Sequence, residues 1–320
     1  MTTVADFIKI QKSDSCKHLH TGMRYASFVR WSGFLVPGFS DTERLNAGSA
    51  SDLALRSEVE RFIQMRIDSA HDLSLLLSYA LTESNSENVT ACNGTVNIDF
   101  VSKCKNSTEF LDAISAVSEK YADKIAFRPF LGIDSDKENN LALANMLLES
   151  KLFSGIELYG TRFASTPEKY LMIFNTVHEL NLDSRVCCFG FRELPDRDSI
   201  FELMLNLRPN LLLNPNIAIN NDNLRIFKDL KIFPEVIAFI KDNNIHIEFS
   251  PAPILSGKKG EQKAQVIREF AENDIPFSLA TEDMLFLNKS ISEFATDLCN
   301  TGVFSVEEMS QLISDTPSAT

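Results

Sequence analysis

The sequence predicts an α/β protein that folds as a (β/α)8 barrel of the TIM type. Short apolar runs alternate with amphipathic segments over most of the chain, a pattern typical of parallel βαβ units. Eight runs qualify as strands, and the 320 residues are enough to close them into one barrel. A doubly wound open sheet is the alternative. No Gly-x-Gly-x-x-Gly or phosphate-loop sequence follows any of the runs, which argues against a nucleotide cofactor.

Each strand candidate is an apolar run of strand length, and most are followed by apolar residues at helical spacing. The strand candidates are Phe7–Ile10, Val96–Val101, Ile125–Leu131, Gly155–Leu158, Arg185–Phe189, Asn210–Leu213, Ile245–Phe249 and Phe277–Ala280. The helix candidates are Thr108–Tyr121, Glu138–Leu152, Pro167–Leu180, Asp198–Leu207, Asn223–Lys241 and Glu261–Glu272. Residues 34–51 are typical of a loop, and 52–82 form one long helical region. We therefore expect one domain, 1–320, with a lid or helical insertion over about 34–90.

Composition narrows the classes of partner. The net charge of −13 argues against a surface for nucleic acid or anionic membrane, which needs clustered Lys and Arg. Small molecules or proteins are the expected partners. The opening residues 1–10 carry no secretory signal, so the sequence predicts a cytoplasmic protein. In that reducing compartment the six cysteines, which lack zinc-finger or redox spacing, are expected to be free thiols.

Polar side chains cluster where the predicted strands end, and barrel enzymes hold their chemistry at those ends. Glu282 and Asp283 follow the last strand candidate directly. Near the start, Cys16 and His18 are two residues apart, and so are His18 and His20. Residues at this spacing on an extended segment face the same side and can ligate a metal together. The residues alone leave open which pair does so, and whether either does.

Several segments in this order resemble the adenosine deaminase family of the amidohydrolase superfamily, especially its bacterial adenosine-deaminase-like branch. They are Lys12-Ser-Asp14, Gly22-Met-Arg-Tyr25, Phe28-Val-Arg-Trp31-Ser-Gly33, Gly155-Ile-Glu-Leu-Tyr-Gly160, Pro167-Glu-Lys169, Ile245-His-Ile-Glu-Phe-Ser-Pro251 and Phe277-Ser-Leu-Ala-Thr-Glu-Asp283-Met-Leu-Phe-Leu-Asn288. The resemblance implies a zinc-bearing barrel of the metal-dependent hydrolase type, which attacks the purine C6 with metal-activated water and releases ammonia.

Transferred residue by residue, the catalytic pattern of the family is degenerate. The resemblance puts Cys16, His18, Cys188 and Glu282 at the metal-ligand positions, with His20 as an alternative ligand. It puts Phe191 at the position of the acid/base carboxylate and Asn214 at that of the catalytic imidazole. The implied purine contacts, Gly160 and Asp283, are retained.

These losses decide the functional prediction. A phenyl ring cannot transfer a proton and an amide is a poor base, whereas hydrolytic deamination needs an acid/base group and an activated water. Adjacent Cys187 is expected to face away from Cys188, in the core. We predict a pseudoenzyme without a metal cofactor, which keeps a purine-nucleoside-like pocket or binds a protein partner. The alternative is an active metal-dependent purine nucleoside deaminase with a rearranged zinc site.

Overall fold

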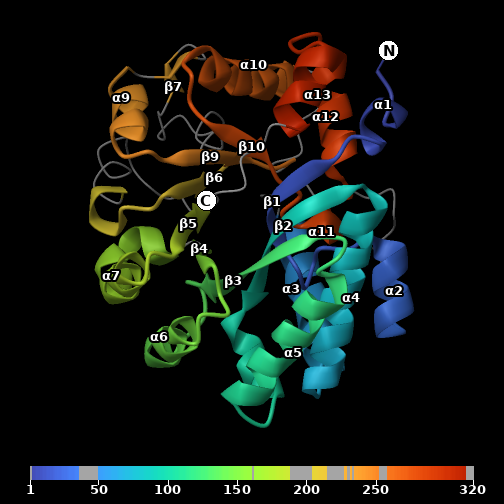
Figure 1. Ribbon diagram of the computed structural model, residues 1–320, viewed down its shortest axis with the longest axis vertical. Coiled ribbons are helices and arrows are strands. Elements are labelled where there is room, and N and C mark those ends of the chain that lie inside the picture. The colour runs from blue at the N-terminus through green and yellow to red at the C-terminus, as the bar shows by residue number, and fades with distance from the viewer. Residues whose placement is uncertain are drawn as a thin grey trace.

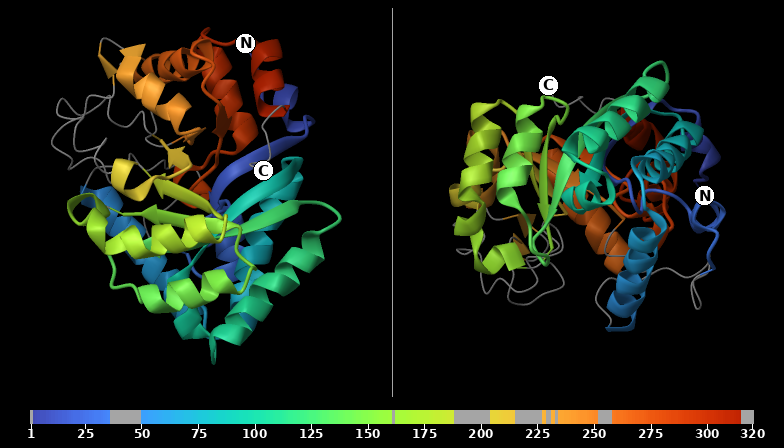
Figure 2. Two further views of the ribbon diagram at one scale, coloured as in Figure 1. Left: turned by 60° about the vertical axis from the view of Figure 1, so that its left-hand side comes forward. Right: turned by 90° about the horizontal axis from the view of Figure 1, so that it is seen from below.

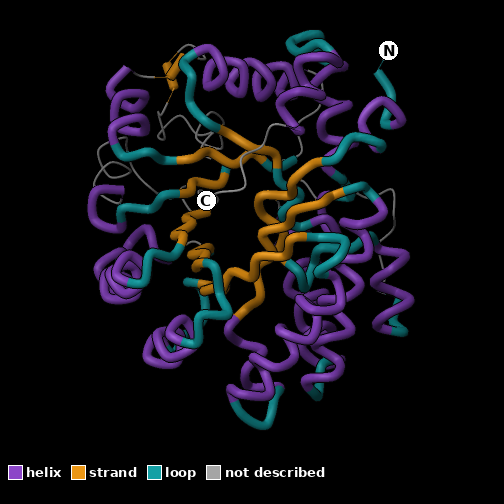
Figure 3. Tube along the Cα trace, viewed as in Figure 1, coloured by secondary structure: helices purple, strands orange, loops and turns teal. Residues whose placement is uncertain are grey.

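The computed structural model describes residues 2–35, 50–160, 162–187, 204–214, 227–228, 231–232, 234–251 and 258–314. Eight parallel strands form a nearly closed barrel in the order β1-β2-β3-β4-β5-β6-β9-β10 (Figures 1 and 3). They are β1 (Lys12–His18), β2 (Val89–Asn97), β3 (Ala126–Asp134), β4 (Gly155–Tyr159), β5 (Asp183–Cys187), β6 (Leu211–Leu213), β9 (His246–Phe249) and β10 (Phe277–Leu279). A short antiparallel pair, β7 (Phe227–Lys228) and β8 (Lys231–Ile232), lies apart from this sheet. The predicted barrel is confirmed, and the open-sheet alternative is wrong.

Backbone contacts just beyond β10 close the ring against β1. The amide of His18 donates to the carbonyl of Glu282 at 3.0 Å, and the amide of Glu282 donates to the carbonyl of Cys16 at 2.8 Å. Side chains reinforce this seam, because the hydroxyl of Thr281 donates to the carboxylate of Asp14 at 2.5 Å. The residues after the last strand are thus built into the barrel wall.

Helices surround the barrel on its outer side (Figure 2). In the described residues they are α1 (Ala5–Ile8), α2 (Tyr25–Ser32), α3 (Ala50–Arg66), α4 (Ala70–Ser86), α5 (Ser107–Tyr121), α6 (Leu141–Glu149), α7 (Leu171–Glu179), α9 (Pro234–Asp242), α10 (Lys258–Glu272), α11 (Met284–Leu287), α12 (Ile291–Asn300) and α13 (Val306–Ser314). Three 3-10 segments add η1 (Ile98–Lys103), η2 (Arg162–Ser165) and η3 (Pro167–Tyr170). Among these helices none combines the length and the apolar character needed to cross a membrane.

The first strand lies later in the chain than predicted. Phe7, expected in a strand, is buried in the helix α1, and the polar segment Lys12–His18 forms β1. Every residue of β1 except Ser13 is buried. Asp14 pairs with Lys17, and His18 pairs with Glu157 and Asp283 inside the protein. The strand therefore needs no alternation of apolar and polar residues. A search for hydrophobic periodicity could not detect it.

The other boundaries shift less. The predicted second strand, Val96–Val101, begins at Val89 instead, and its predicted end is the 3-10 segment η1. The long helical region expected over 52–82 is two helices, α3 and α4, separated near Ser69, whose hydroxyl caps α4 by accepting the amide of Asp72. The predicted insertion over about 34–90 therefore contains two helices, while its loop at 36–49 lies outside the described residues.

Successive side chains along the strands point alternately to the core beneath the helices and to the barrel interior. Residues such as Leu158 and Val186 face outward and join the large apolar core beneath the helices. Their neighbours Glu157 and Cys187 are buried on the opposite side, inside the barrel. The barrel interior therefore receives the polar residues of β4 and β5, and that interior contains the candidate site.

Candidate functional site

The candidate site lies inside the barrel, at the carboxyl ends of its strands. β1 contributes Cys16 and His18, β4 contributes Glu157, β5 contributes Arg185 and Cys187, and β9 contributes Glu248. Segments just beyond the strands add Asn214, Ser250, Glu282 and Asp283. All of these residues are buried. Such a density of buried ionisable groups is stable only if each is paired, so the pairing shows what the site can do.

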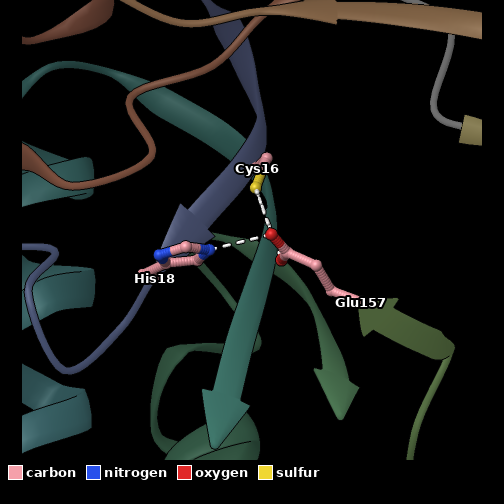
Figure 4. A group of neighbouring side chains, drawn as sticks. All are labelled: Cys16, His18 and Glu157. Atoms are coloured by element: carbon pink, nitrogen blue, oxygen red, sulfur yellow. Dashed lines mark hydrogen bonds and ion pairs between the residues drawn. The ribbon is translucent and has the colours of Figure 1, made fainter. Parts of the chain in front are cut away.

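His18 lies at the centre, between two carboxylates. Its Nε2 lies 2.8 Å from Oε1 of Glu157 (Figure 4), and its Nδ1 lies 3.0 Å from Oδ1 of Asp283. Ionised carboxylates only accept hydrogen bonds, so both ring nitrogens must donate. Burial alone would lower the pKa of His18, but the charges of Glu157 and Asp283 outweigh burial and hold the pKa well above its usual range. His18 is therefore an imidazolium in this arrangement.

Arg185 links Glu157 to one further carboxylate, that of Glu248. Its Nε lies 2.6 Å and its Nη2 3.0 Å from the two carboxylate oxygens of Glu248, a bidentate pair, and its Nη1 lies 3.4 Å from Glu157. The guanidinium also stacks on the ring of Phe130, 4.3 Å from its centroid. Burial would raise the pKa of Glu157, but the charges of His18 and Arg185 and their hydrogen bonds bring it down to about 2. Glu157 is therefore an anion held between two cations.

Asn214 occupies the position where the resemblance expects a catalytic imidazole, and its amide is fully engaged. Its Nδ2 donates to Oγ of Ser250 at 2.7 Å and to Oε2 of Glu282 at 3.0 Å. Its Oδ1 accepts the backbone amide of Ser250 at 2.8 Å. With φ at 54° the residue is left-handed, a conformation that asparagine tolerates well. Asn214 therefore acts as a structural connector between the ends of β6, β9 and β10.

Two thiols line the same interior. Sγ of Cys16 lies 3.6 Å from Oε2 of Glu157, and Sγ of Cys187 lies 3.9 Å from Oε1 of Glu282. Burial raises the pKa of the Cys16 thiol well above its ordinary value, and the carboxylates around it add to this shift against the opposing charge of Arg185. Cys187 is buried, as expected, but it faces the barrel interior with Cys16, so the expectation that it faces away from the site is wrong. Cys188 lies outside the described residues.

Among the described residues, Cys16, His18 and Glu157 form a group that could hold a metal ion, with ligand atoms within 4.8 Å of one another (Figure 4). Thiolate, imidazole and carboxylate are a suitable zinc set. In this arrangement both ring nitrogens of His18 are engaged by carboxylates and Cys16 is a thiol. Coordination by both residues would therefore release their protons. The set also differs from the predicted one, in which Cys188 and Glu282 complete the site in place of Glu157.

The predicted purine contacts lie at the rim of this cluster. Gly160 follows β4 with φ at 95°, and a Cβ there would come within 2.6 Å of Oγ of Ser135. Asp283 accepts from Nδ1 of His18, from the hydroxyl of Thr21 at 2.5 Å, and from Nη1 of Arg56 at 2.9 Å. Its pKa, which burial would raise, lies well below its usual range because of His18 and Arg56.

His20, the alternative ligand, stacks on His18 with ring centroids 5.9 Å apart. Burial and the charge of His18 lower the pKa of His20 to about 3, so His20 is neutral. It does not belong to the set of candidate metal ligands found among the described residues. Phe191, at the predicted acid/base position, lies outside the described residues.

Sequence reasoning missed the charged residues within the strands. Glu157 and Glu248 each interrupt an apolar run and Arg185 begins one, and a charge inside a buried strand is the signal that could have identified them. Their pairing depends on strand order, which follows only from the closed barrel. Arg56 comes from the helical insertion, and the sequence offers no signal for its approach to Asp283.

Comparison with known proteins agrees with the barrel fold and with the resemblance to adenosine deaminases. The chain matches no protein-family model. It is 21% identical over 297 residues to a Treponema pallidum (strain Nichols) protein classed as an adenosine/adenine deaminase, covering 91% of this chain and 92% of that protein. An Arabidopsis structure, ADAL complexed with GMP, is 17% identical with a TM-score of 0.69, covering 96% of this chain and 91% of that chain.

A zinc-bound amidohydrolase of Burkholderia ambifaria is 13% identical with a TM-score of 0.65, covering 97% of this chain and 90% of that chain. These two structures show the fold. The Treponema protein aligns over nearly its whole length, so the similarity extends to the sequence. The chain is therefore similar to an adenosine/adenine deaminase in sequence over nearly its whole length, and it shares its fold with the two solved structures.

Proposed function

We propose that this protein is a non-hydrolytic member of the adenosine/adenine deaminase family, one that binds a purine nucleoside or nucleotide without deaminating it. The observation that carries the proposal is the state of His18, whose two ring nitrogens both donate to carboxylates. A metal-activated water needs a ligand imidazole with a free lone pair. With both nitrogens engaged by carboxylates, His18 has none left for a metal ion in this arrangement.

Neither of the two positions to which the resemblance assigns acid/base chemistry holds a group that transfers protons. The amide of Asn214 is tied to Ser250 and Glu282 and cannot accept a proton at neutral pH. By resemblance, the acid/base position belongs to Phe191. Loss of a positioned acid/base group alone costs about 10²–10⁴-fold in rate, so the proposal expects ammonia release close to background.

Ligand binding is proposed because both residues to which the resemblance assigns purine contacts are retained. Gly160 keeps a backbone conformation with positive φ, and Asp283 is an anion. The Arabidopsis protein of the same fold was solved with GMP, which makes purine nucleotides reasonable probes beside nucleosides. If purines do not bind, a role in binding a protein partner is the remaining form of the pseudoenzyme proposal.

One observation favours a second candidate, an active zinc hydrolase with a rearranged site. Cys16, His18 and Glu157 already lie close enough to converge on one ion. For this candidate, zinc must displace the protons of Cys16 and His18, and Glu157 must exchange its hydrogen bond with His18 for the metal.

Three measurements on the purified protein separate these candidates. Metal content is measured after incubation with zinc and extensive dialysis, ammonia release is measured with adenosine, and thermal shift is measured with adenosine and with GMP. We expect no bound zinc, no ammonia above background, and a raised melting temperature with at least one purine. Stoichiometric zinc that is lost in the variant His18→Ala/Glu157→Ala would overturn the metal-free proposal, and no shift with either purine would leave the protein-binding role.

A further inference from the structure

A residue of the helical insertion reaches the rim of the candidate site. Nη1 of Arg56, on α3, lies 2.9 Å from Oδ2 of Asp283, and their side chains are only 20% and 10% exposed. The guanidinium also stacks over the ring of Phe286 in α11, 4.4 Å from its centroid. An ion pair and a cation–π contact therefore hold Arg56 in one place.

The two oxygens of Asp283 have different partners. Oδ1 accepts from Nδ1 of His18 at 3.0 Å and from the hydroxyl of Thr21 at 2.5 Å, both from the first strand and the turn after it. Oδ2 accepts from Arg56. A ligand that donates a hydrogen bond to Asp283 can therefore reach Oδ2 most directly by taking the place of the guanidinium.

The helix that carries Arg56 is itself firmly packed. The inner face of α3 carries Val59 and Ile63, and Ile67 directly follows the helix. Each of the three side chains is 1% exposed and belongs to the main apolar core. Arg56 lies about one turn before Val59. The contact with Asp283 can thus break by rotation of the long arginine side chain while the helix stays in place.

We propose that Arg56 is a specificity-determining latch that competes with the ligand for Oδ2 of Asp283. The inference rests on the proposed function, in which Asp283 contacts the purine. Because the Asp283 side chain is only 10% exposed, a ligand N–H and the guanidinium of Arg56 compete for the accessible side of Oδ2. The latch therefore selects purines that present an N–H donor to Asp283 and lowers the affinity for every ligand at this position.

Affinity measurements test the competition directly. Dissociation constants for adenosine and GMP are measured by calorimetry with the native chain and with Arg56→Met, which keeps much of the side-chain volume without the charge. We expect Arg56→Met to bind about three- to tenfold more tightly, the range set by a partly buried ion pair. Equal or weaker binding of both purines by the variant would overturn the latch.

A matched control comes from the same helix. Arg61 of α3 also lies over an aromatic ring, that of Phe62 at 5.1 Å, and its guanidinium contacts Sδ of Met65 rather than the candidate site. Arg61→Met is expected to leave both dissociation constants unchanged. A gain in affinity equal to that of Arg56→Met would show a general effect of charge on α3 and would contradict the latch.

A double-mutant cycle tests the contact without any ligand. The unfolding constants of the native chain, Arg56→Met, Asp283→Asn and the double variant give the coupling between the two side chains, expected at about fivefold. A coupling factor of one refutes the latch. Failure of the native chain and of Arg56→Met alike to bind adenosine or GMP refutes the proposed purine function and the latch together, whereas equal binding refutes the latch alone.

Discussion

Arg185 neutralises two carboxylates that have no access to water. Replacing it by methionine leaves Glu157 and Glu248 buried beside each other, and breaking a buried pair in this way costs about 3–5 kcal/mol. We expect Arg185→Met to lose that much unfolding free energy in urea denaturation. Arg268→Met serves as the control, because the pair of Arg268 with Glu308 is half-exposed and contributes below about 1 kcal/mol. Similar losses in both variants would contradict the assigned role of Arg185.

Gly160 combines positive φ with crowded surroundings. An alanine at this position must adopt φ near 95° and place its Cβ 2.6 Å from Oγ of Ser135. Gly302 has φ of 80°, but a Cβ added there would meet no atom within 4 Å. Backbone strain alone costs about 1–2 kcal/mol, so we expect Gly160→Ala to lose clearly more unfolding free energy than Gly302→Ala. Equal losses in chemical denaturation would show that the contact with Ser135 relaxes freely.

The residues of the site divide according to what the sequence can reveal. His18, Glu282 and Asp283 were predicted from spacing and resemblance, because side chains at strand ends follow from the order of the elements. Arg185, Glu157 and Arg56 were not, because their roles arise from contacts between segments distant in the chain. Glu157 and Arg185 face each other only because β4 and β5 are neighbours in the barrel.

Among the strands, β9 is tied to β10 by a histidine side chain as well as by backbone, since Nε2 of His246 lies 2.9 Å from Oγ of Ser278. Burial, together with the charge of Arg185, lowers the pKa of His246 to about 4. The unfolded chain, with a histidine pKa near 6.5, therefore binds a proton that the folded chain does not between these two pH values. The folded state thus becomes less stable as pH falls from 6.5 towards 4.

His246→Gln removes the titrating group and keeps a hydrogen-bond donor near Ser278. Between pH 6.5 and 5 we expect the native chain to lose ~1.5 kcal/mol relative to this variant, from the linkage between proton binding and folding. Urea denaturation at the two pH values measures the difference. A constant gap between the two proteins would show that His246 titrates normally in the fold.

Elements were predicted where apolar periodicity is the controlling signal. The strands β3, β4, β6, β9 and β10 lie within a few residues of the apolar runs that predicted them. β1 was missed because its sequence, Lys12 to His18, contains no apolar alternation, and the buried partners that stabilise it lie elsewhere in the chain. The break between α3 and α4 depends on one serine cap, which is a weak signal within a long helical pattern.

The barrel as a whole is closed by backbone hydrogen bonds between β1 and the segment after β10. If this seam is as stable as the rest of the wall, the amides of His18 and Glu282 open only when the molecule unfolds. We expect both amides to exchange with deuterium as slowly as those in the centre of β3, measured by NMR. Exchange faster by several orders of magnitude would identify the seam as a point of local opening.

The hydrogen bonds of Asn214 restrict which substitutions this site can accept during evolution. Its amide satisfies the backbone amide and hydroxyl of Ser250 and the carboxylate of Glu282 at once. A neutral histidine in its place has one donor and one acceptor, so it cannot keep all three contacts. Replacing Asn214 by the imidazole that the resemblance expects therefore requires coordinated changes at Ser250 and Glu282, and such epistasis makes the replacement hard to reach by single substitutions.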